Sequence, residues 1–360
     1  MNKLIGKILS MIITFIMMLN VLSVGVFAED TMINPAENKA TTVQQTFTFQ
    51  TDLVLSKDTL VPNATISYTI QGETQDGSGR ISGPSGPSIA EITFSHDDEV
   101  LVIAGNQNEG IVSKNVTVTF PENTFTKVGI YRYKISQVIN CPGGGLLADT
   151  PSQYLDVYVQ NGTNDDLEVT YFVLASIENN SAGSSTYNGK SAGFRIHYTT
   201  HDLTVKKEVR GNQGDKTKRF TFQITITNSG DATKKYTYKI NNLIQDGTFV
   251  SGSVQEIYLA HNDQIEILGL TDKDQYTIKE VTEADYETKY KIGTTTDEQP
   301  YTQPITGSQI TEDVMITIIN IKDVVAPTGL IMTFAPYVLM IILAIIVAVV
   351  FLNRKKHHIE

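Results

Sequence analysis

Short runs of alternating apolar and polar residues recur along most of this chain, and they constrain its fold more than any other feature. They are rich in Val, Ile, Thr, Tyr and Phe, and residues such as Gly, Asn, Asp and Pro separate them. The runs cover residues 46–55, 65–70, 115–120, 130–135, 154–160, 169–174, 203–209, 220–227, 264–268, 276–281 and 314–321. No long 3.6-residue period competes with them outside the two ends of the chain. We therefore predict an all-β protein made of two β-sandwiches in tandem.

The first 28 residues have the layout of a secretory signal peptide. Lys3 and Lys7 make the start positive, an apolar run covers residues 8–27, and Ala28 ends a cleavage site of small residues. We predict export with cleavage after Ala28, followed by a polar and flexible leader over residues 29–44. An uncleaved membrane anchor is the alternative interpretation of this segment.

Residues 325–360 contain the three parts of a sortase signal. The pentamer Val-Ala-Pro-Thr-Gly precedes an apolar segment, 330–352, which is long enough to span a bilayer, and a basic tail follows it. In such a substrate the sortase cysteine attacks the carbonyl of Thr328, releases Gly329 and all that follows, and leaves an acyl-enzyme for an amine to resolve. The pentamer departs from the common Leu-Pro-X-Thr-Gly form, because its proline is third and no leucine precedes it. An ordinary single-pass anchor with a chance Pro-Thr-Gly is the alternative.

The chain between these two signals is acidic. Of the 28 Lys and Arg residues five lie in the two removed ends, and of the 39 Asp and Glu residues one does, so 23 basic and 38 acidic side chains remain, a net charge of −15. Such a surface argues against nucleic acid as a partner. Cys141 is the only cysteine, so no intrachain disulfide can form. The sequence has no motif for a metal, a cofactor or a hydrolytic active site, so we expect no metal, no cofactor and no enzyme acting on outside substrates.

We place the boundary between the two domains near residues 199–202, where one alternating run ends and the next begins. The predicted domains cover residues 45–201 and 202–324, and the short linker leaves little slack between them. Within the first domain we expect residues 76–88, rich in Gly, Ser and Pro, to form a loop.

Three apolar strands of the second domain each carry one polar residue on the face that alternation assigns to the core. These residues are Lys207, Glu280 and Asn320. Burial lowers the pKa of a lysine and raises that of a glutamate. A neutral Lys207 amine is a nucleophile for the Asn320 carboxamide, which protonated Glu280 can polarise. Loss of ammonia then leaves an isopeptide bond between Lys207 and Asn320. The alternative is a buried ion pair with a hydrogen-bonded amide.

Four segments occur in the order LTVKKEV, YTIKE, MITIIN and VAPTG, the first starting at residue 203. In these the chain resembles the T-antigen (FctA-type) backbone pilins of Gram-positive bacteria, and the resemblance extends over the whole mature chain. It implies two Ig-like (CnaB-like) β-sandwich domains, each with a self-formed Lys–Asn bond promoted by a Glu, polymerised by a sortase. By this resemblance Lys207, Glu280 and Asn320 are the bond-forming lysine, the catalytic glutamate and the asparagine.

The first domain departs from that family pattern at all three positions. Thr51 stands at the lysine position, Gln137 at the glutamate position and Ile196 at the asparagine position. We therefore predict no Lys–Asn bond in this domain. Two other crosslinks stay open. One is a Thr51–Gln137 ester, whose hydroxyl and carboxamide we expect to face each other. The other is a thioester between Cys141 and a glutamine, against which the glycine-rich loop 141–145 argues because we expect it to be mobile.

The resemblance also implies an acceptor for the sortase reaction. In these pilins it is a lysine just before the last strand of the first domain, and Lys190 occupies that position here. We predict that the amine of Lys190 receives the Thr328 acyl group of a neighbouring subunit; an ordinary solvated lysine is the alternative.

The function predicted from these features is structural, as a repeating subunit of a covalent pilus attached to the cell wall. The expected partners are a sortase and identical subunits, with minor pilins and host surface ligands as further ones. We expect contact with the membrane only before sortase cleavage. The alternative function is a binding module, either a pilus-tip adhesin or a wall-anchored adhesin that is not polymerised.

Overall fold

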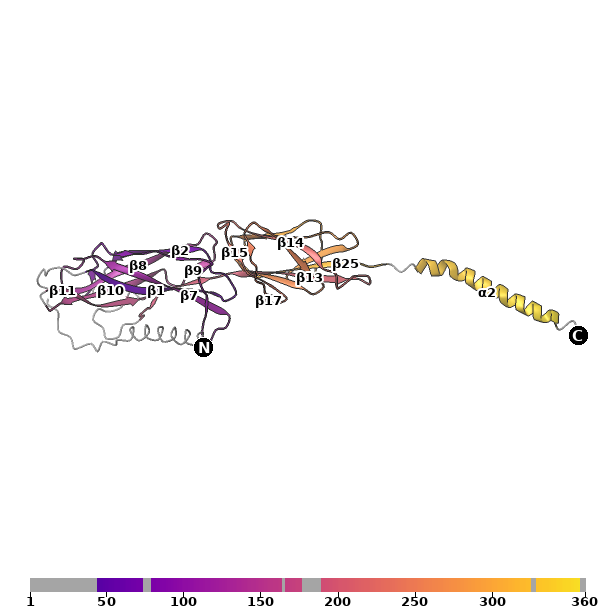
Figure 1. The fold of residues 1–360 in the computed structure, drawn as a ribbon, viewed down its shortest axis with the longest axis horizontal. Helices are drawn as coiled ribbons and strands as arrows, with labels where there is room; N and C mark the ends of the chain where they lie inside the picture. Colours follow the sequence, from indigo (N-terminus) through magenta and orange to yellow (C-terminus); the bar gives the residue numbers. More distant parts are fainter. Residues whose placement is uncertain (1–43, 74–78, 164–165, 177–188, 325–327, 357–360) are drawn as a thin grey trace, which may run out of the picture.

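The structure is a computed structural model, and it describes residues 44–73, 79–163, 166–176, 189–324 and 328–356. Strands and the loops that connect them form two groups of sheets, which follow one another along the long axis, and one helix comes after them (Figure 1). The predicted all-β class with two β domains is confirmed. The predicted signal peptide, residues 1–28, and all of the leader except its last residue lie outside the described residues.

The first domain has two six-stranded sheets, with the orders β4-β7-β1-β12-β9 and β11-β10-β8-β2-β5; β6 lies beside β7 and β3 beside β8. The strands are β1 Gln45–Ser56, β2 Ala64–Gly72, β3 Ile81–Ser82, β4 Ser88–Ile89, β5 Ile92–Phe94, β6 Leu101–Val102, β7 Glu109–Phe120, β8 Gly129–Asn140, β9 Leu146–Ala148, β10 Ser152–Asn161, β11 Leu167–Ala175 and β12 Gly193–Tyr198. The expectation of a loop over residues 76–88 is wrong in part. That stretch contains β3 and the first residue of β4, because its backbone pairs with β8 and β7.

The second domain has a seven-stranded sheet with the order β17-β16-β20-β13-β25-β22-β23, a four-stranded sheet with the order β19-β14-β21-β24, and the pair β15-β18. The strands are β13 His201–Arg210, β14 Phe220–Asn228, β15 Lys235–Tyr236, β16 Tyr238–Ile240, β17 Leu243–Ile244, β18 Phe249–Val250, β19 Val254–Leu259, β20 Gln264–Leu270, β21 Asp274–Glu280, β22 Glu287–Ile292, β23 Gln299–Pro300, β24 Ile305–Ser308 and β25 Val314–Ile321.

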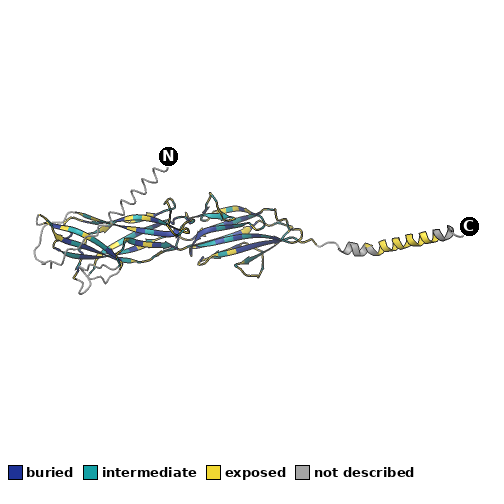
Figure 2. Ribbon diagram, turned by 90° about the horizontal axis from the view of Figure 1, so that it is seen from below, coloured by how far each residue is buried: buried dark blue, intermediate teal, exposed yellow. Residues whose placement is uncertain are grey.

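The sequence alternation becomes an alternation of burial that places the core between the sheets. Along β13, the residues from Leu203 to Val209 are alternately buried and half-buried, and Figure 2 shows the same banding along most long strands. One apolar cluster fills the second domain and two fill the first. Each fully buried large side chain, such as Phe220 or Phe222, stabilises the fold by roughly 1.5–3 kcal/mol.

Both domains place their first and last strands side by side and parallel. β1 pairs with β12 in the first domain, and β13 pairs with β25 in the second. Parallel neighbours require a long crossover, which here is the whole intervening domain. Each parallel pair lies inside its sheet, flanked by β7 and β9 or by β20 and β22. Because the two strands run in the same direction, the chain enters each domain at one end and leaves it at the other.

The chain passes between the domains within two residues. β12 ends at Tyr198 and β13 begins at His201, so only Thr199 and Thr200 lie between strands. The domain limits 45–201 and 202–324 stay a proposal, with β13 beginning one residue before the second range.

Helix α2, Thr328–Lys356, follows the second domain and contains Pro336. In the described part of the chain no helix is both long enough and apolar enough to qualify as a membrane span. The segment 330–352 lies within α2, but several of its side chains are outside the described residues, so its role as a span stays a prediction.

A buried ion cluster joins the segment before β3 to the middle of the second sheet. Arg80 Nε lies 2.7 Å from Asp156 Oδ2, and Arg132 Nε lies 2.7 Å from Asp156 Oδ1. The side chains of all three residues are fully buried. Removing one member of such a cluster costs more than the cluster itself contributes, because it takes a counter-charge away from charges that stay buried.

We expect Asp156→Ala to lower the free energy of unfolding by about 3–5 kcal/mol, since two buried guanidinium groups then lose this carboxylate. Urea denaturation of residues 44–324 measures the loss. The control is Glu91→Ala at an exposed acid, with an expected change within about 0.5 kcal/mol. Equal losses in the two variants would contradict the importance of the cluster.

Candidate functional site

Lys207 lies on the core face of β13 with no exposed surface. Alternation along the strand places it between buried Val205 and Val209. Its amine nitrogen lies 4.3 Å from the centroid of the Phe220 ring and 5.7 Å from that of Phe222. The amine is therefore removed from water and surrounded on one side by aromatic rings.

Glu280 and Asn320 meet this amine from two other strands. Glu280 ends β21 in the opposite sheet and is 2% exposed, whereas Asn320 lies on β25, beside β13, and is 0% exposed. Lys207 Nζ lies 3.0 Å from Glu280 Oε1 and 3.2 Å from Oε2. Asn320 Nδ2 donates a hydrogen bond to Glu280 Oε1 at 2.7 Å. One carboxylate thus holds both the amine and the carboxamide, and the structure brings the three predicted residues together.

The register of the parallel strands explains why Lys207 and Asn320 converge. Lys207 is opposite Ile318, and Val209 is opposite Asn320. The two polar residues are therefore offset by two positions on neighbouring strands. Because side chains two positions apart share a face, both point into the core. The long lysine side chain can span this offset.

Burial shifts the pKa of both ionisable groups toward their neutral forms. Loss of hydration lowers the pKa of Lys207 to about 8, while Glu280 opposes this shift. Loss of hydration also raises the pKa of Glu280, against the opposing effects of Lys207 and of the hydrogen bond from Asn320. The state with a neutral Lys207 amine and a protonated Glu280 carboxyl is therefore more populated here than it would be in water.

The Asn320 carbonyl oxygen is the unsatisfied group of the site. In the described part of the chain, Asn320 Oδ1 is buried without a hydrogen-bond partner. A half-turn of the carboxamide exchanges its oxygen and nitrogen, which the hydrogen-bond network alone distinguishes. That turn directs the carbonyl oxygen toward Glu280, where a protonated carboxyl can donate to it. Such a hydrogen bond makes the carboxamide carbon more electrophilic.

Tyr301 supports the position of Glu280, and sequence analysis did not identify it. β24 pairs with β21 only as far as Ile278, opposite Ile305. Two residues beyond this end of the ladder, the Glu280 backbone N–H donates to the Tyr301 hydroxyl at 2.8 Å. The hydroxyl replaces a strand carbonyl and fixes the backbone that carries the carboxylate. Tyr301 lies outside any alternating run, so no sequence signal indicated it.

The corresponding positions of the first domain have the same geometry. Thr51 is opposite Phe194, and Leu53 is opposite Ile196, the same two-residue offset as between Lys207 and Asn320. Thr51 and Ile196 have no exposed surface. The alignment of these positions with the triad of the second domain therefore agrees with the strand register.

The Thr51 hydroxyl and the Gln137 amide nitrogen have other partners, whereas Gln137 Oε1 is buried without a hydrogen-bond partner among the described residues. Thr51 Oγ1 lies 2.6 Å from the Tyr68 hydroxyl, and Gln137 Nε2 donates to the Thr150 carbonyl at 2.9 Å. Tyr68 is opposite Gln137, as Phe222 is opposite Glu280 in the second domain. Tyr68 has a hydroxyl that Phe222 lacks, and this hydroxyl is the hydrogen-bond partner of Thr51. The hydrogen bonds at these positions do not join Thr51 to Gln137 and so give an ester no support, and the expectation that the two side chains face each other stays a prediction.

Cys141 is half-buried, and its thiol donates to the Gly144 carbonyl at 3.2 Å. Burial raises the pKa of the thiol, which disfavours the reactive thiolate. The expectation that loop 141–145 is mobile is wrong, because the Gly143 carbonyl accepts hydrogen bonds from Asn228 and Thr271 of the second domain. The thiol's contacts with the backbone of Gly143 and Gly144 give a thioester no support.

Lys190 is exposed and lies three residues before Gly193, the first residue of β12. It forms an isolated β-bridge with Ala175, and the backbone N–H of Ser191 donates to Leu174 at 2.9 Å. This segment is therefore fixed to the end of β11, with the lysine facing solvent. Thr328 and Gly329 begin helix α2, and their side chains are outside the described residues.

A second buried cluster contains the same kinds of groups, and sequence analysis missed it. Lys234 Nζ donates to Asp274 Oδ2 at 2.6 Å, and Asn228 Nδ2 donates to Asp274 Oδ1 at 2.7 Å. Here the Asn228 carbonyl oxygen accepts the N–H groups of Gly230 and Asp231. The signal was present, since Asp274 lies on the core face of its strand. The groups around the Asp274 carboxylate are hydrogen-bond donors. Among the described residues no group of His, Cys, Asp or Glu is arranged to hold a metal ion.

The chain is similar in sequence and in fold to known proteins. Residues 201–322 match a family model described as a domain of unknown function, DUF7601. A pilin of Streptococcus pyogenes serotype M1 is 27% identical over 329 residues, which cover 86% of this chain and 90% of the relative. The crystal structure of the major pilin from Streptococcus pyogenes superposes with a TM-score of 0.54 at 22% identity, covering 78% of this chain and 99% of that one. The T3.2 major pilin of the same species gives a TM-score of 0.52 at 20% identity, covering 79% and 99%.

Proposed function

Because the chain is homologous to the Streptococcus pyogenes major pilin, we propose that it is the repeating backbone subunit of a covalent pilus on the cell surface. A backbone pilin is a structural component, so its reactive residues act on the chain itself. The buried cluster of Lys207, Glu280 and Asn320 between the first and last strands of the second domain is the observation that carries this proposal.

The proposed reaction forms one isopeptide bond and releases one ammonia. The neutral Lys207 amine attacks the Asn320 carboxamide carbon while protonated Glu280 donates to its carbonyl oxygen. A C–N bond to Lys207 forms, and the bond to Asn320 Nδ2 breaks after this nitrogen gains a proton. Glu280 takes the proton that the amine loses and passes it to the leaving nitrogen, so the carboxyl group ends as it began.

The product crosslinks the second domain where force acts on it. The bond closes a loop of about 110 residues, which stabilises the fold by roughly 4–5 kcal/mol if it acts like a disulfide of that span. Its mechanical effect is larger. β13 and β25 are parallel neighbours, so tension along the chain pulls them in shear. With Lys207 joined to Asn320, that tension passes through covalent bonds and bypasses the sandwich.

The position of Lys190 supports a simple reason for the missing triad in the first domain. If a neighbour is attached at Lys190, tension enters just before β12 and runs through residues 190–207 to the crosslink. It then continues from Asn320 to Thr328. Strands β1 to β11 lie beside this path and carry none of the load. A Lys–Asn crosslink at the positions of Thr51 and Ile196 would therefore add nothing to the strength of the fibre.

Sortase joins the subunits in this proposal. Its cysteine attacks the Thr328 carbonyl, the segment from Gly329 leaves with the amine of the broken peptide bond, and the Lys190 amine of a second subunit displaces the enzyme. The exposure of Lys190 supports its access to the enzyme. The membrane holds only the precursor, and the product is a homopolymer attached to the cell wall. Minor pilins and host surface ligands are the further partners that we propose for this polymer.

We expect the intact mass of residues 29–328 to fall short of the calculated value by one ammonia. Lys207→Ala and Asn320→Ala should each remove this deficit, because each lacks one partner of the bond. The matched control is Lys206→Ala, on the other face of the same strand, which should keep the deficit. A wild-type chain without the deficit contradicts the bond, and a deficit of two shows that a second site has reacted.

The rate of bond formation should follow a bell-shaped dependence on pH. In the reactive form Lys207 is neutral and Glu280 is protonated, so the two groups share one titratable proton. They lose this proton as pH rises above the Lys207 pKa of about 8. Below the raised pKa of Glu280 the pair instead gains a second proton and the amine is no longer neutral. On each side we expect the rate to fall about tenfold per pH unit. Refolding of unreacted chain, sampled by mass spectrometry over time, measures the rate; an unchanged rate above pH 8 contradicts the proposed role of Glu280 as proton donor.

Cell-wall extracts of a host with the matching sortase should show a ladder of detergent-resistant polymers on a blot for this protein. Lys190→Arg should abolish the ladder, since a guanidinium cannot accept the acyl group, whereas Lys127→Arg at another exposed lysine should keep it. A branched Lys190–Thr328 peptide after trypsin identifies the link. One monomeric band from the wild type would instead favour a wall-anchored adhesin.

A further inference from the structure

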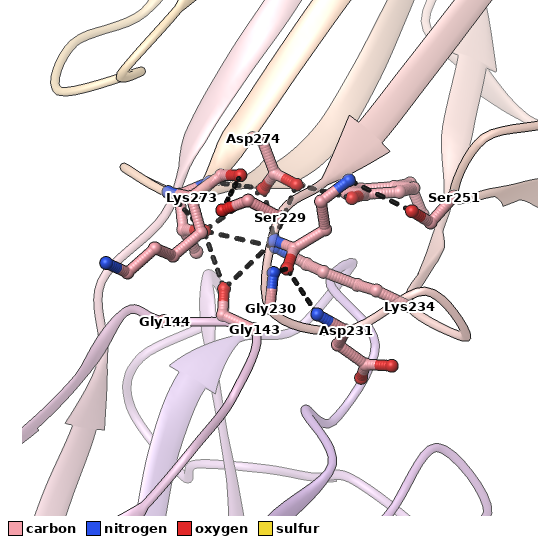
Figure 3. Close-up of polar contacts among 12 residues, drawn as sticks. Gly143, Gly144, Ser229, Gly230, Asp231, Lys234, Ser251, Lys273 and Asp274 are labelled. Carbon is pink, nitrogen blue, oxygen red and sulfur yellow. Dashed lines mark hydrogen bonds and ion pairs between the residues drawn. The ribbon is translucent and has the colours of Figure 1, made fainter.

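We propose that the second domain contains a built receptor for the Gly143 carbonyl of the first domain, and that this contact makes the two domains one rigid unit. Figure 3 shows the loop of Gly143 and Gly144 meeting the cluster around Asp274. The inference is independent of the isopeptide bond and of polymerisation, because it concerns only the junction between the domains.

The receptor is organised around one buried carboxylate. Asp274 has no exposed surface. Its Oδ1 accepts hydrogen bonds from Asn228 and from the Tyr236 hydroxyl, and its Oδ2 accepts from Lys234 and from the Thr271 backbone N–H. Hydrogen bonds to an ionised group are stronger than those between neutral groups. Asp274 therefore fixes the side chain of Asn228 and the backbone of Thr271 before the first domain is in contact.

Two donors of this cluster point at the first domain. Thr271 Oγ1 donates to the Gly143 carbonyl at 2.7 Å, and the second hydrogen of Asn228 Nδ2 donates to the same oxygen at 3.2 Å. Both bonds are buried. Without the Gly143 carbonyl the second hydrogen of Asn228 Nδ2 would lose a buried partner, which costs about 1–3 kcal/mol where water cannot reach it. The Thr271 hydroxyl would keep only its longer contact with Asp274 Oδ2, at 3.1 Å.

Glycines on both sides allow the backbones to approach closely. A Cβ at Gly230 would lie 1.9 Å from the Pro142 carbonyl oxygen, and one at Gly144 would lie 2.8 Å from Asp272 Oδ1. Pro142 and Gly230 belong to different domains, and the blocking atom at Gly230 is backbone. A methyl group at that position cannot be accommodated unless the domains separate.

A different turn of the first domain provides further contacts. Thr237 Oγ1 donates to the Asp58 carbonyl at 2.5 Å, and Lys239 Nζ lies 3.0 Å from the Asp58 carboxylate. Asn63 Nδ2 donates to Asp231 Oδ2 at 3.1 Å. The junction is therefore held at more than one point in addition to the two-residue linker. Contacts at separate points oppose rotation in more than one direction, which a linker alone cannot do.

The test compares the rotational diffusion of the two domains in residues 44–324 by ¹⁵N relaxation. We expect one common diffusion tensor for the wild type. Gly230→Ala should abolish it, so that each domain tumbles separately and faster. Gly247→Ala is the matched control in the same domain, because a Cβ there meets nothing closer than 3.4 Å and should leave the tensor unchanged.

Thr271→Val gives a second and milder variant, which keeps the side-chain shape but removes the shorter hydrogen bond to Gly143 together with the longer contacts of the hydroxyl with Asp274 and Lys234. We expect increased motion between the domains with the spectrum of each domain retained, and this variant decides the question if Gly230→Ala does not fold. Separate tensors in the wild type would overturn the proposal. A common tensor in both Gly230→Ala and Thr271→Val would overturn it as well.

Discussion

The removal of one lysine amine from water is the constraint on which the rest of this structure depends. Lys207 is held inside the second domain by two neighbouring strands and the opposite sheet, and its charge is balanced there by Glu280 alone among the contacts of the described residues. A buried ion pair contributes little net stability, because desolvation offsets most of the attraction. The same desolvation favours the neutral, nucleophilic form of the amine, which the proposed reaction with Asn320 requires.

The two buried carboxylates of the second domain differ in how fully the asparagine beside each is hydrogen-bonded. Each holds a lysine and an asparagine by similar hydrogen bonds. Around Asp274 every polar atom of Asn228 has a partner, including its carbonyl oxygen. Around Glu280 the Asn320 carbonyl oxygen has none among the described residues. In the proposed reaction this oxygen can accept a hydrogen bond from protonated Glu280, whereas the Asn228 oxygen is already occupied.

The two domains use related frameworks for different tasks. In the first, Tyr68 supplies a hydroxyl to Thr51 at a site where the second domain has Phe222 beside Lys207. A neutral hydrogen bond there replaces a reactive pair without changing the strand register. If force enters at Lys190, the second domain and the linker transmit it. The Gly143 contact then keeps the first domain aligned with that path, so the unit behaves as one rod.

The alternating runs were enough to predict the all-β class, the central residues of the long strands and the inward direction of Lys207, Glu280 and Asn320. A period of two decides which face a residue occupies, and that information is local. The parallel pairing of β13 with β25, the hydrogen bond of Tyr301 beyond the end of β24 and the burial of the loop at Gly143 by the other domain become visible only in the folded chain. These contacts join residues far apart in the chain through hydrogen bonds of irregular segments, and such segments have no periodicity from which a partner can be read.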